Sequence, residues 1–110
     1  MGKFIITKRK DGEYQFNLKA GNGEIILTSE GYTTKAGCKN GIESVRTNSQ
    51  IDSRFERKTA TNDKLFFVLK AGNGEIIGKS QLYSTRQGME NGIASVKENA
   101  PQSEIIDETI

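Results

Sequence analysis

The sequence of 110 residues contains no histidine and only one cysteine, Cys38. Serine and cysteine nucleophiles are normally activated by a neighbouring histidine, so the hydroxyl and thiol groups of this protein lack their usual catalytic partner. A single cysteine excludes an intrachain disulfide. The sequence also lacks the common metal-binding patterns, because it has no histidine, one cysteine and no EF-hand spacing of acidic residues. We therefore expect no enzyme: no catalytic residue, no metal site and no cofactor.

Long apolar segments are absent as well. No run approaches the roughly 18 apolar residues that cross a bilayer, and the N-terminus lacks the basic and apolar regions of a secretory signal. These absences predict a cytoplasmic protein without a membrane partner. The net charge of +2 is too small to indicate nucleic acid by itself.

What the sequence does contain is an internal duplication with an offset of 51 residues. The nonapeptide Leu-Lys-Ala-Gly-Asn-Gly-Glu-Ile-Ile occupies positions 18–26 and again 69–77. Between residues 16–49 and 67–100, twenty of thirty-four pairs are identical. Repeats of about 50 residues bury too little apolar surface to be stable alone, so we expect residues 1–110 to form one domain of two repeats, about 3–52 and 54–108.

Each repeat begins with patterns typical of β-strands. Lys3 to Lys8 is rich in β-branched and aromatic residues, and residues 13–20 alternate between apolar and polar, as a half-buried strand does. The turn after Ala20 allows two registers. A two-residue Asn-Gly loop pairs Ala20 with Ile25, whereas a type I turn with a glycine bulge pairs it with Glu24; the sequence leaves both open.

Helical spacing follows in both repeats. Cys38, Ile42 and Val45 lie four and three residues apart, which indicates a helix that Thr33 could cap. The second helix is expected near residues 84–99, opened by a Ser84-x-x-Gln87 capping box. Residues 54–59 and 104–107 then read as further strands. Since the residue equivalent to Cys38 is a methionine, we expect the thiol to be buried as a small apolar group.

The recurring Lys-Ala-Gly-Asn-Gly-Glu-Ile-Ile, the Ser and Tyr that follow, and Asn-Gly-Ile-x-Ser-Val resemble the YegP-like family of small bacterial proteins. The resemblance covers residues 3–108. It implies an α+β fold in which tandem β(3)-α-β repeats form a single antiparallel sheet, with two helices on one face and exchanged C-terminal strands. It implies no catalytic residues, because the family is one of unknown function. Two departures from internal symmetry, Leu27 opposite Gly78 and Gly31 opposite Leu82, leave this expectation unchanged.

Two surfaces are candidates for binding a partner. On the sheet face opposite the helices, the first repeat offers Gln15, Asn17 and Lys19, whereas the second repeat offers an apolar pair at the equivalent positions. A protein partner or a weak homodimer is therefore the first expectation, with possible contacts at Phe66, Val68 and Lys70. Nucleic acid is the second expectation, through a positive edge that forms if the two strands carrying it are neighbours. The residues of this edge are Lys8, Arg9, Lys10, Arg54, Arg57 and Lys58.

Other recurring residues have ordinary structural explanations. Ala-Gly-Asn-Gly-Glu leads into a strand rather than a helix, so it predicts a hairpin turn and not a phosphate-binding loop. Glu24 and Glu75 follow these turns, where a solvated carboxylate is the usual finding, although a paired-carboxylate site is conceivable. Asn40 and Asn91 lie within the helices, and their amide groups could read a ligand.

Overall fold

The computed structural model describes residues 2–110, which form one seven-stranded sheet and two helices. The first half contains β1 (Lys3–Lys8), β2 (Tyr14–Lys19), β3 (Ile25–Ser29) and α1 (Lys35–Asn48). The second half contains β4 (Phe55–Thr59), β5 (Leu65–Lys70), β6 (Ile76–Lys79), α2 (Arg86–Asn99) and β7 (Glu104–Asp107). Short 3-10 turns at Asp52–Arg54 and Ala100–Gln102 follow the two helices.

The strands lie in the order β4-β5-β6-β3-β2-β1-β7. The expected exchange is confirmed, because the last strand of the chain pairs with β1 at the far side of the first repeat, with Phe4 opposite Ile105. The expectation of a purely antiparallel sheet is wrong in one place. β7 runs parallel to β1, while the other five pairings are antiparallel, so the sheet is mixed. β1 and β7 lie at opposite ends of the chain, so no tight turn joins them and forces an antiparallel pairing.

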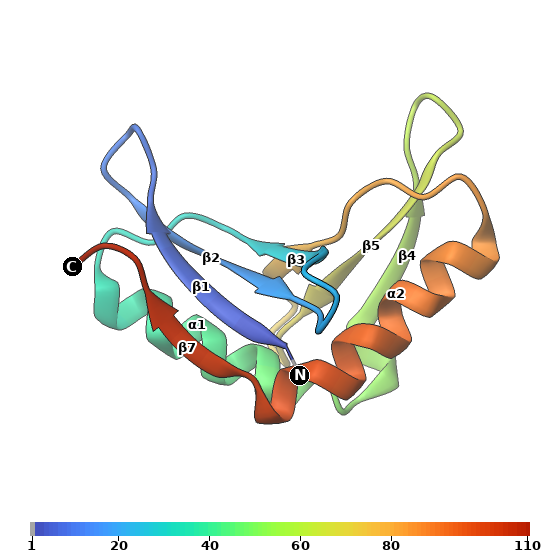
Figure 1. Cartoon of the computed structure of the whole chain (residues 1–110). Helices are drawn as coiled ribbons and strands as arrows, with labels where there is room; N and C mark the ends of the chain where they lie inside the picture. Colours follow the sequence, from blue (N-terminus) through green and yellow to red (C-terminus); the bar gives the residue numbers. More distant parts are fainter. Residues whose placement is uncertain (1) are drawn as a thin grey trace.

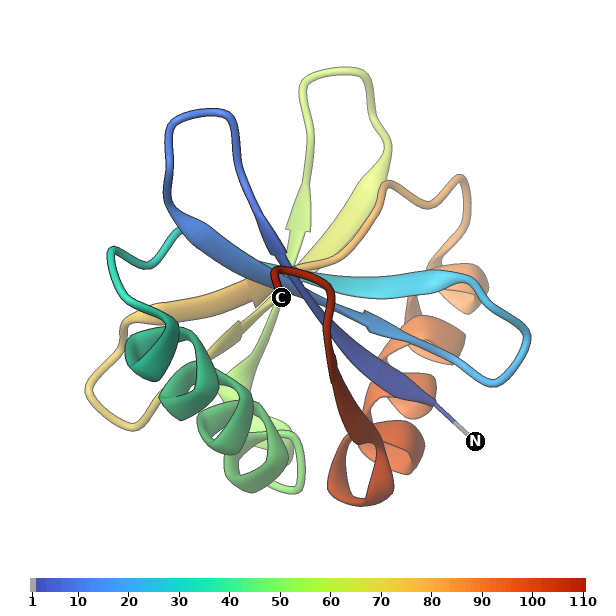
Figure 2. The same cartoon turned by 60° about the vertical axis from the view of Figure 1, so that its left-hand side comes forward.

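Both helices lie on one face of the sheet (Figures 1 and 2), and the core lies between them and the strands. α1 packs on β2, β5 and β6, and α2 packs on β3 and β5, so each helix covers strands of both repeats. Phe16 and Phe67 are fully buried at equivalent places in this core. No helix among residues 2–110 is long and apolar enough to cross a membrane.

The helices begin one residue later than the capping patterns predict. Thr34, not Thr33, accepts a hydrogen bond from the Gly37 amide at 3.0 Å, and Thr85, not Ser84, accepts one from the Gly88 amide. Both caps have extended backbone angles and place their hydroxyl oxygen at an otherwise unpaired helix N–H. Two adjacent hydroxyl residues at each site made the choice ambiguous in the sequence.

The hairpin turns adopt the register with a type I turn and a glycine bulge. The Ala20 amide donates to the Glu24 carbonyl at 2.8 Å, and the Gly23 amide donates to the Ala20 carbonyl at 2.9 Å. Gly23 has a φ of +87°, which glycine adopts without steric cost. A second irregularity follows, since Leu18 pairs with Leu27 but Lys19 pairs with Ile25. The bulge therefore turns Ile25 to the helix-free face and its neighbour, Ile26, to the core.

Candidate functional site

The helix-free face of the sheet is rich in lysine. Strand residues alternate between the two faces, and those paired across this face carry five lysines and two glutamates, Glu56 and Glu104. The five are Lys3, Lys19, Lys58, Lys70 and Lys79. We call these residues the lysine face.

Three of the lysines have no ion pair within residues 2–110. Lys58 and Lys70 share the carboxylate of Glu56, at 3.4 and 2.9 Å, whereas Lys3, Lys19 and Lys79 make no salt bridge. Lys3 and Lys19 lie directly opposite each other on β1 and β2. Like charges at directly opposite positions destabilise a sheet, so this arrangement favours an anion near the two ammonium groups. Glu104 lies opposite Lys3 on β7 and supplies one carboxylate on this side, without a salt bridge to Lys3.

The expected apolar patch is smaller than the sequence indicates. Phe66, Val68 and Lys70 do lie on the helix-free face, with Phe66 partly exposed. Val68, however, is only 2% exposed. It lies between Glu56 and Lys79 in the sheet, whose long side chains flank it. The contact surface proposed from the sequence is thus wrong for Val68. Phe66 remains, and the ammonium nitrogen of Lys79 lies 6.0 Å from the centroid of the Phe66 ring.

The six residues of the expected basic edge do not form one patch. Four strands separate β4 from β1, so Lys8, Arg9 and Lys10 are remote in the sheet from the other three. The condition for a single positive edge, that the two strands be neighbours, is therefore not met, because the repeats meet at β3 and β6 and place their first strands far apart.

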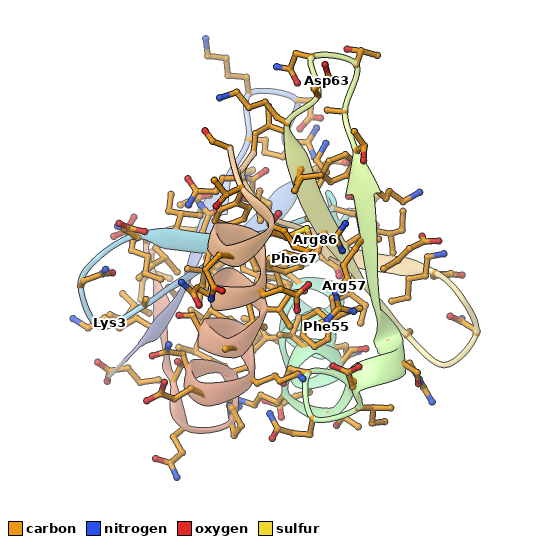
Figure 3. The ribbon with its side chains drawn as sticks, turned by 90° about the vertical axis from the view of Figure 1, so that its right-hand side faces the viewer. Lys3, Phe55, Arg57, Asp63, Phe67 and Arg86 are labelled. Atoms are coloured by element: carbon orange, nitrogen blue, oxygen red, sulfur yellow. The ribbon has the colours of Figure 1, made fainter. Side chains whose placement is uncertain are left out.

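Several of these cations also have partners. Arg57 points toward α2 (Figure 3) and donates two hydrogen bonds to the Glu90 carboxylate, at 2.6 and 2.9 Å. Arg54 donates to the side-chain oxygen of Asn48 at 2.7 Å. Lys58 pairs with Glu56, and Arg9 pairs with Asp11 at 3.2 Å.

A second candidate site is a groove of about 200 Å³ between the β2–β3 hairpin of the first repeat and α2 of the second. Polar groups come from both sides, namely Asn22 and Glu24 from the hairpin and Asn91 and Ser95 from the helix, with Tyr83 at one wall. The remaining lining residues are Ala20, Ile26, Gly88 and Gly92. Thus the recurring turn motif of one repeat faces the recurring helix motif of the other. We call this the α2 groove.

The internal symmetry of the two repeats predicts the same relation between the equivalent residues on the other side. α1 packs against β6 as α2 packs against β3. Burial raises the pKa of the Tyr32 hydroxyl, and the charges of Cys38, Glu30 and Glu75 add to this effect. Glu75 therefore lies near the tyrosine of the other repeat, as Glu24 does in the α2 groove. By this symmetry with the α2 groove, we call the second cluster the α1 groove.

The thiol of Cys38 is not activated for nucleophilic catalysis. Cys38 is buried as expected, and burial, with a smaller effect of Asp107, raises the pKa of its thiol to about 11. A thiol with so high a pKa is protonated at neutral pH and is a poor nucleophile. No cluster of three or more potential metal-ligating histidine, cysteine or acidic side chains occurs within residues 2–110.

Sequence reasoning identified the face and placed Lys19 and Lys70 on it, but not Lys3, Lys58 and Lys79. Lys19 was visible as a polar position of its strand, and the alternation of residues 3–8 could have placed Lys3 on the same face. The cross-strand neighbourhood of Lys3 and Lys19 requires the register of β1 on β2. The α2 groove could not be found, because its two sides lie about 70 positions apart in the chain.

Known proteins resemble this chain over nearly its full length. The UPF0339 protein YegP of Shigella flexneri is 54% identical over 108 residues, covering 98% of each chain. The solution NMR structure of yegP from Escherichia coli, described as a protein of unknown function, superimposes with a TM-score of 0.93 at 52% identity, covering 97% of this chain and 92% of that one. The NMR structure of a UPF0339 protein from Shewanella oneidensis gives a TM-score of 0.91 at 52% identity, covering 96% and 90%. A domain model of unknown function, DUF1508, matches twice, at residues 10–56 and 60–107. The chain therefore belongs to the DUF1508 family, as a tandem-repeat member similar to YegP.

Proposed function

We propose that this protein is a small non-catalytic binding module whose lysine face binds single-stranded nucleic acid. The observation that carries the proposal is the group of Lys3, Lys19 and Lys79, which lack ion pairs on the one face of the sheet that no helix covers. Outside this face, Lys35 pairs with Asp107 at 2.9 Å and Lys97 pairs with Asp52 at 2.7 Å. Free cations on an open surface are available to phosphate groups.

The other residues of this face suit nucleic acid better than a protein partner. Gln15, Asn17 and Thr28 lie on β2 and β3 and offer amide and hydroxyl groups for base edges. Phe66 offers part of a ring on which a base can stack. A protein contact would need a larger apolar patch than the partly exposed Phe66 and the exposed Ile25 and Ile76, which lie on different strands.

The test measures the fluorescence anisotropy of labelled oligo(dT) and oligo(U) at 50 mM salt and above. Replacing Lys3, Lys19 and Lys79 together by glutamine should weaken binding at least tenfold. Three phosphate contacts predict a slope of log K against log[salt] of about −2 for a single strand. A control with Lys8, Lys10 and Lys39 replaced by glutamine removes the same charge elsewhere and should change affinity less than twofold.

The substitution Phe66→Ser should weaken oligonucleotide binding with the circular dichroism spectrum unchanged, because Phe66 lies outside the helix-side core. An equal loss in the control variant would show that binding does not depend on the lysine face. Absence of binding at 50 mM salt, or equal binding of a poly-glutamate peptide of the same length, would refute the proposal.

A further inference from the structure

Every residue that lines the α2 groove is identical at the equivalent position of the other repeat. Nine positions line the groove, and all nine agree at the offset of 51. In the whole aligned segment only twenty of thirty-four pairs agree. The duplication has therefore kept the lining of these two grooves while the rest of the repeats changed.

Packing accounts for some of these identities. A Cβ at Gly92 would clash with the Tyr83 hydroxyl, and Ser95 accepts a hydrogen bond from Asn99 at 3.1 Å. The side-chain oxygen of Asn22 accepts from the Glu24 amide at 3.0 Å and fixes the turn. These residues would be retained for folding alone.

Packing does not account for the asparagine within each helix. Four helix positions are exposed in both repeats, and Asn40 with Asn91 is the only identical pair among them. The other three pairs are Ala36 with Gln87, Glu43 with Ala94, and Thr47 with Glu98. Asparagine in a helix interior is less favourable than alanine or lysine, and the Asn40 side chain makes no hydrogen bond within residues 2–110.

The carboxylate of each groove is also unexplained by packing. Glu24 and Glu75 are exposed, and their side chains make no ion pair or hydrogen bond within the described chain. They belong to identical turns, but the turn itself uses only the amide of this residue. An unpaired carboxylate and an exposed helical asparagine thus face each other across the repeats.

We propose that the α1 and α2 grooves are two equivalent binding sites for a small molecule that carries a primary ammonium group. The α2 groove contains one carboxylate and no lysine or arginine, so its charge favours a cation and disfavours an anion. Asn91 can donate through its amide nitrogen, while its oxygen already accepts from Gln87 at 2.9 Å. The volume of about 200 Å³ corresponds to about seven water molecules at roughly 30 Å³ each, which suits a ligand of a few carbon atoms.

The experiment titrates the full-length, isotopically labelled protein with putrescine and follows its amide NMR signals. The neutral isostere of putrescine, 1,4-butanediol, serves as the matched ligand control. Putrescine should shift the amides of residues 22–24 and 88–95, together with the equivalent amides 73–75 and 37–44. Butanediol should leave both sets unmoved.

The duplication supplies an internal control. Glu24→Gln should weaken putrescine binding at the α2 groove at least tenfold and leave the α1 groove unchanged, and Glu75→Gln should do the reverse. Asn91→Ala should also weaken putrescine binding at the α2 groove without lowering the melting temperature. A purely structural role of Asn91 would not predict this combination. The proposal is overturned if 10 mM putrescine moves neither set, if butanediol moves them equally, or if Glu24→Gln affects both grooves alike. These outcomes are independent of oligonucleotide binding on the lysine face.

Discussion

The two repeats form equivalent cores but complete the sheet in different ways. β1 has a neighbour on each side, because β7 pairs along its outer edge, whereas the equivalent strand β4 pairs only with β5. The free edge strand β4 is exposed after Phe55 and carries Glu56, Arg57 and Lys58 in succession. Charged residues on an edge strand prevent pairing with other chains. The chain thus has one strand more than two three-stranded units need, and this strand, β7, covers the outer edge of β1.

The largest expected effect comes from removing that extra strand. A chain ending at Ala100 loses the β1–β7 pairing, the packing of Ile105 on the core and the ion pair of Lys35 with Asp107. Ile105 and Ile106 are half-buried, so together they contribute about 1.5–3 kcal/mol, a sizeable part of the stability of a domain of this size. We expect loss of cooperative unfolding in both repeats, measured by thermal denaturation and hydrogen exchange.

A chain ending at Thr109 is the matched control, because it removes only Ile110, which is 97% exposed. It should unfold like the full-length protein. Native hydrogen-exchange protection of β2 and β3 in the shorter chain would show that the first repeat does not depend on β7.

The next effect concerns the contact between the repeats, where symmetry must break. β3 and β6 are neighbours, and a Cβ at Gly78 would lie 2.8 Å from Cγ of Leu27. One leucine therefore fills the space beside the pseudo-twofold axis, and its counterpart has to be glycine. Leu27→Ala should destabilise by about 2–5 kcal/mol through the cavity, and Gly78→Leu by about 1–3 kcal/mol through overpacking.

Combining Leu27→Ala with Gly78→Leu moves the leucine to the other repeat. The double variant should be more stable than the sum of the single changes predicts, by about 1–3 kcal/mol in a double-mutant cycle from urea denaturation. Strict additivity would contradict the compensation between these two positions.

A smaller effect should be the same in both repeats. Gly92 and Gly41 allow a tyrosine to lie flat against each helix, since an added Cβ would be 2.7 and 2.6 Å from Cζ of Tyr83 and Tyr32. Alanine at either position should lower the free energy of unfolding by about 1–3 kcal/mol, as measured by urea denaturation.

Gly88→Ala provides the comparison within the same helix. The nearest neighbour of its Cβ is the Thr85 hydroxyl oxygen at 3.2 Å, and alanine gains about 1 kcal/mol in helix propensity. We expect little change or a slight stabilisation. Equal destabilisation by Gly88→Ala and Gly92→Ala would mean that the tyrosine contact is not the cause.

The smallest effect separates the two outer hairpins. Gly12 has a φ of +86° in the first, whereas Asp63, at the tip of the second (Figure 3), has a φ of +65°. A non-glycine residue in this region costs about 1 kcal/mol. Asp63→Gly should therefore raise the free energy of unfolding by up to about 1 kcal/mol, and Gly12→Asp should lower it by a similar amount, both by thermal denaturation. A lower melting temperature for Asp63→Gly would contradict this reasoning.

Much of this fold could be predicted because its signals are local. Residues 3–8 and 104–107 form the predicted strands, and the spacing of Cys38, Ile42 and Val45 places them on the buried side of α1. The offset of 51 predicted two equivalent units. Alternation also placed Phe66 and Val68 on the helix-free face, although not the burial of Val68, which depends on neighbours in other strands.

Tertiary structure alone decided how the units are joined. Hydrogen bonding between β3 and β6 puts β1 and β4 at opposite sides of the sheet, which separates the basic residues that the sequence grouped together. The same arrangement brings Glu24 to Asn91 across the repeats. Within the first repeat, the register of β1 on β2 sets Lys3 opposite Lys19. A sequence determines the period of each segment and therefore which side of it is buried. It does not determine which segments become neighbours, because that depends on the free energy of packing the whole chain.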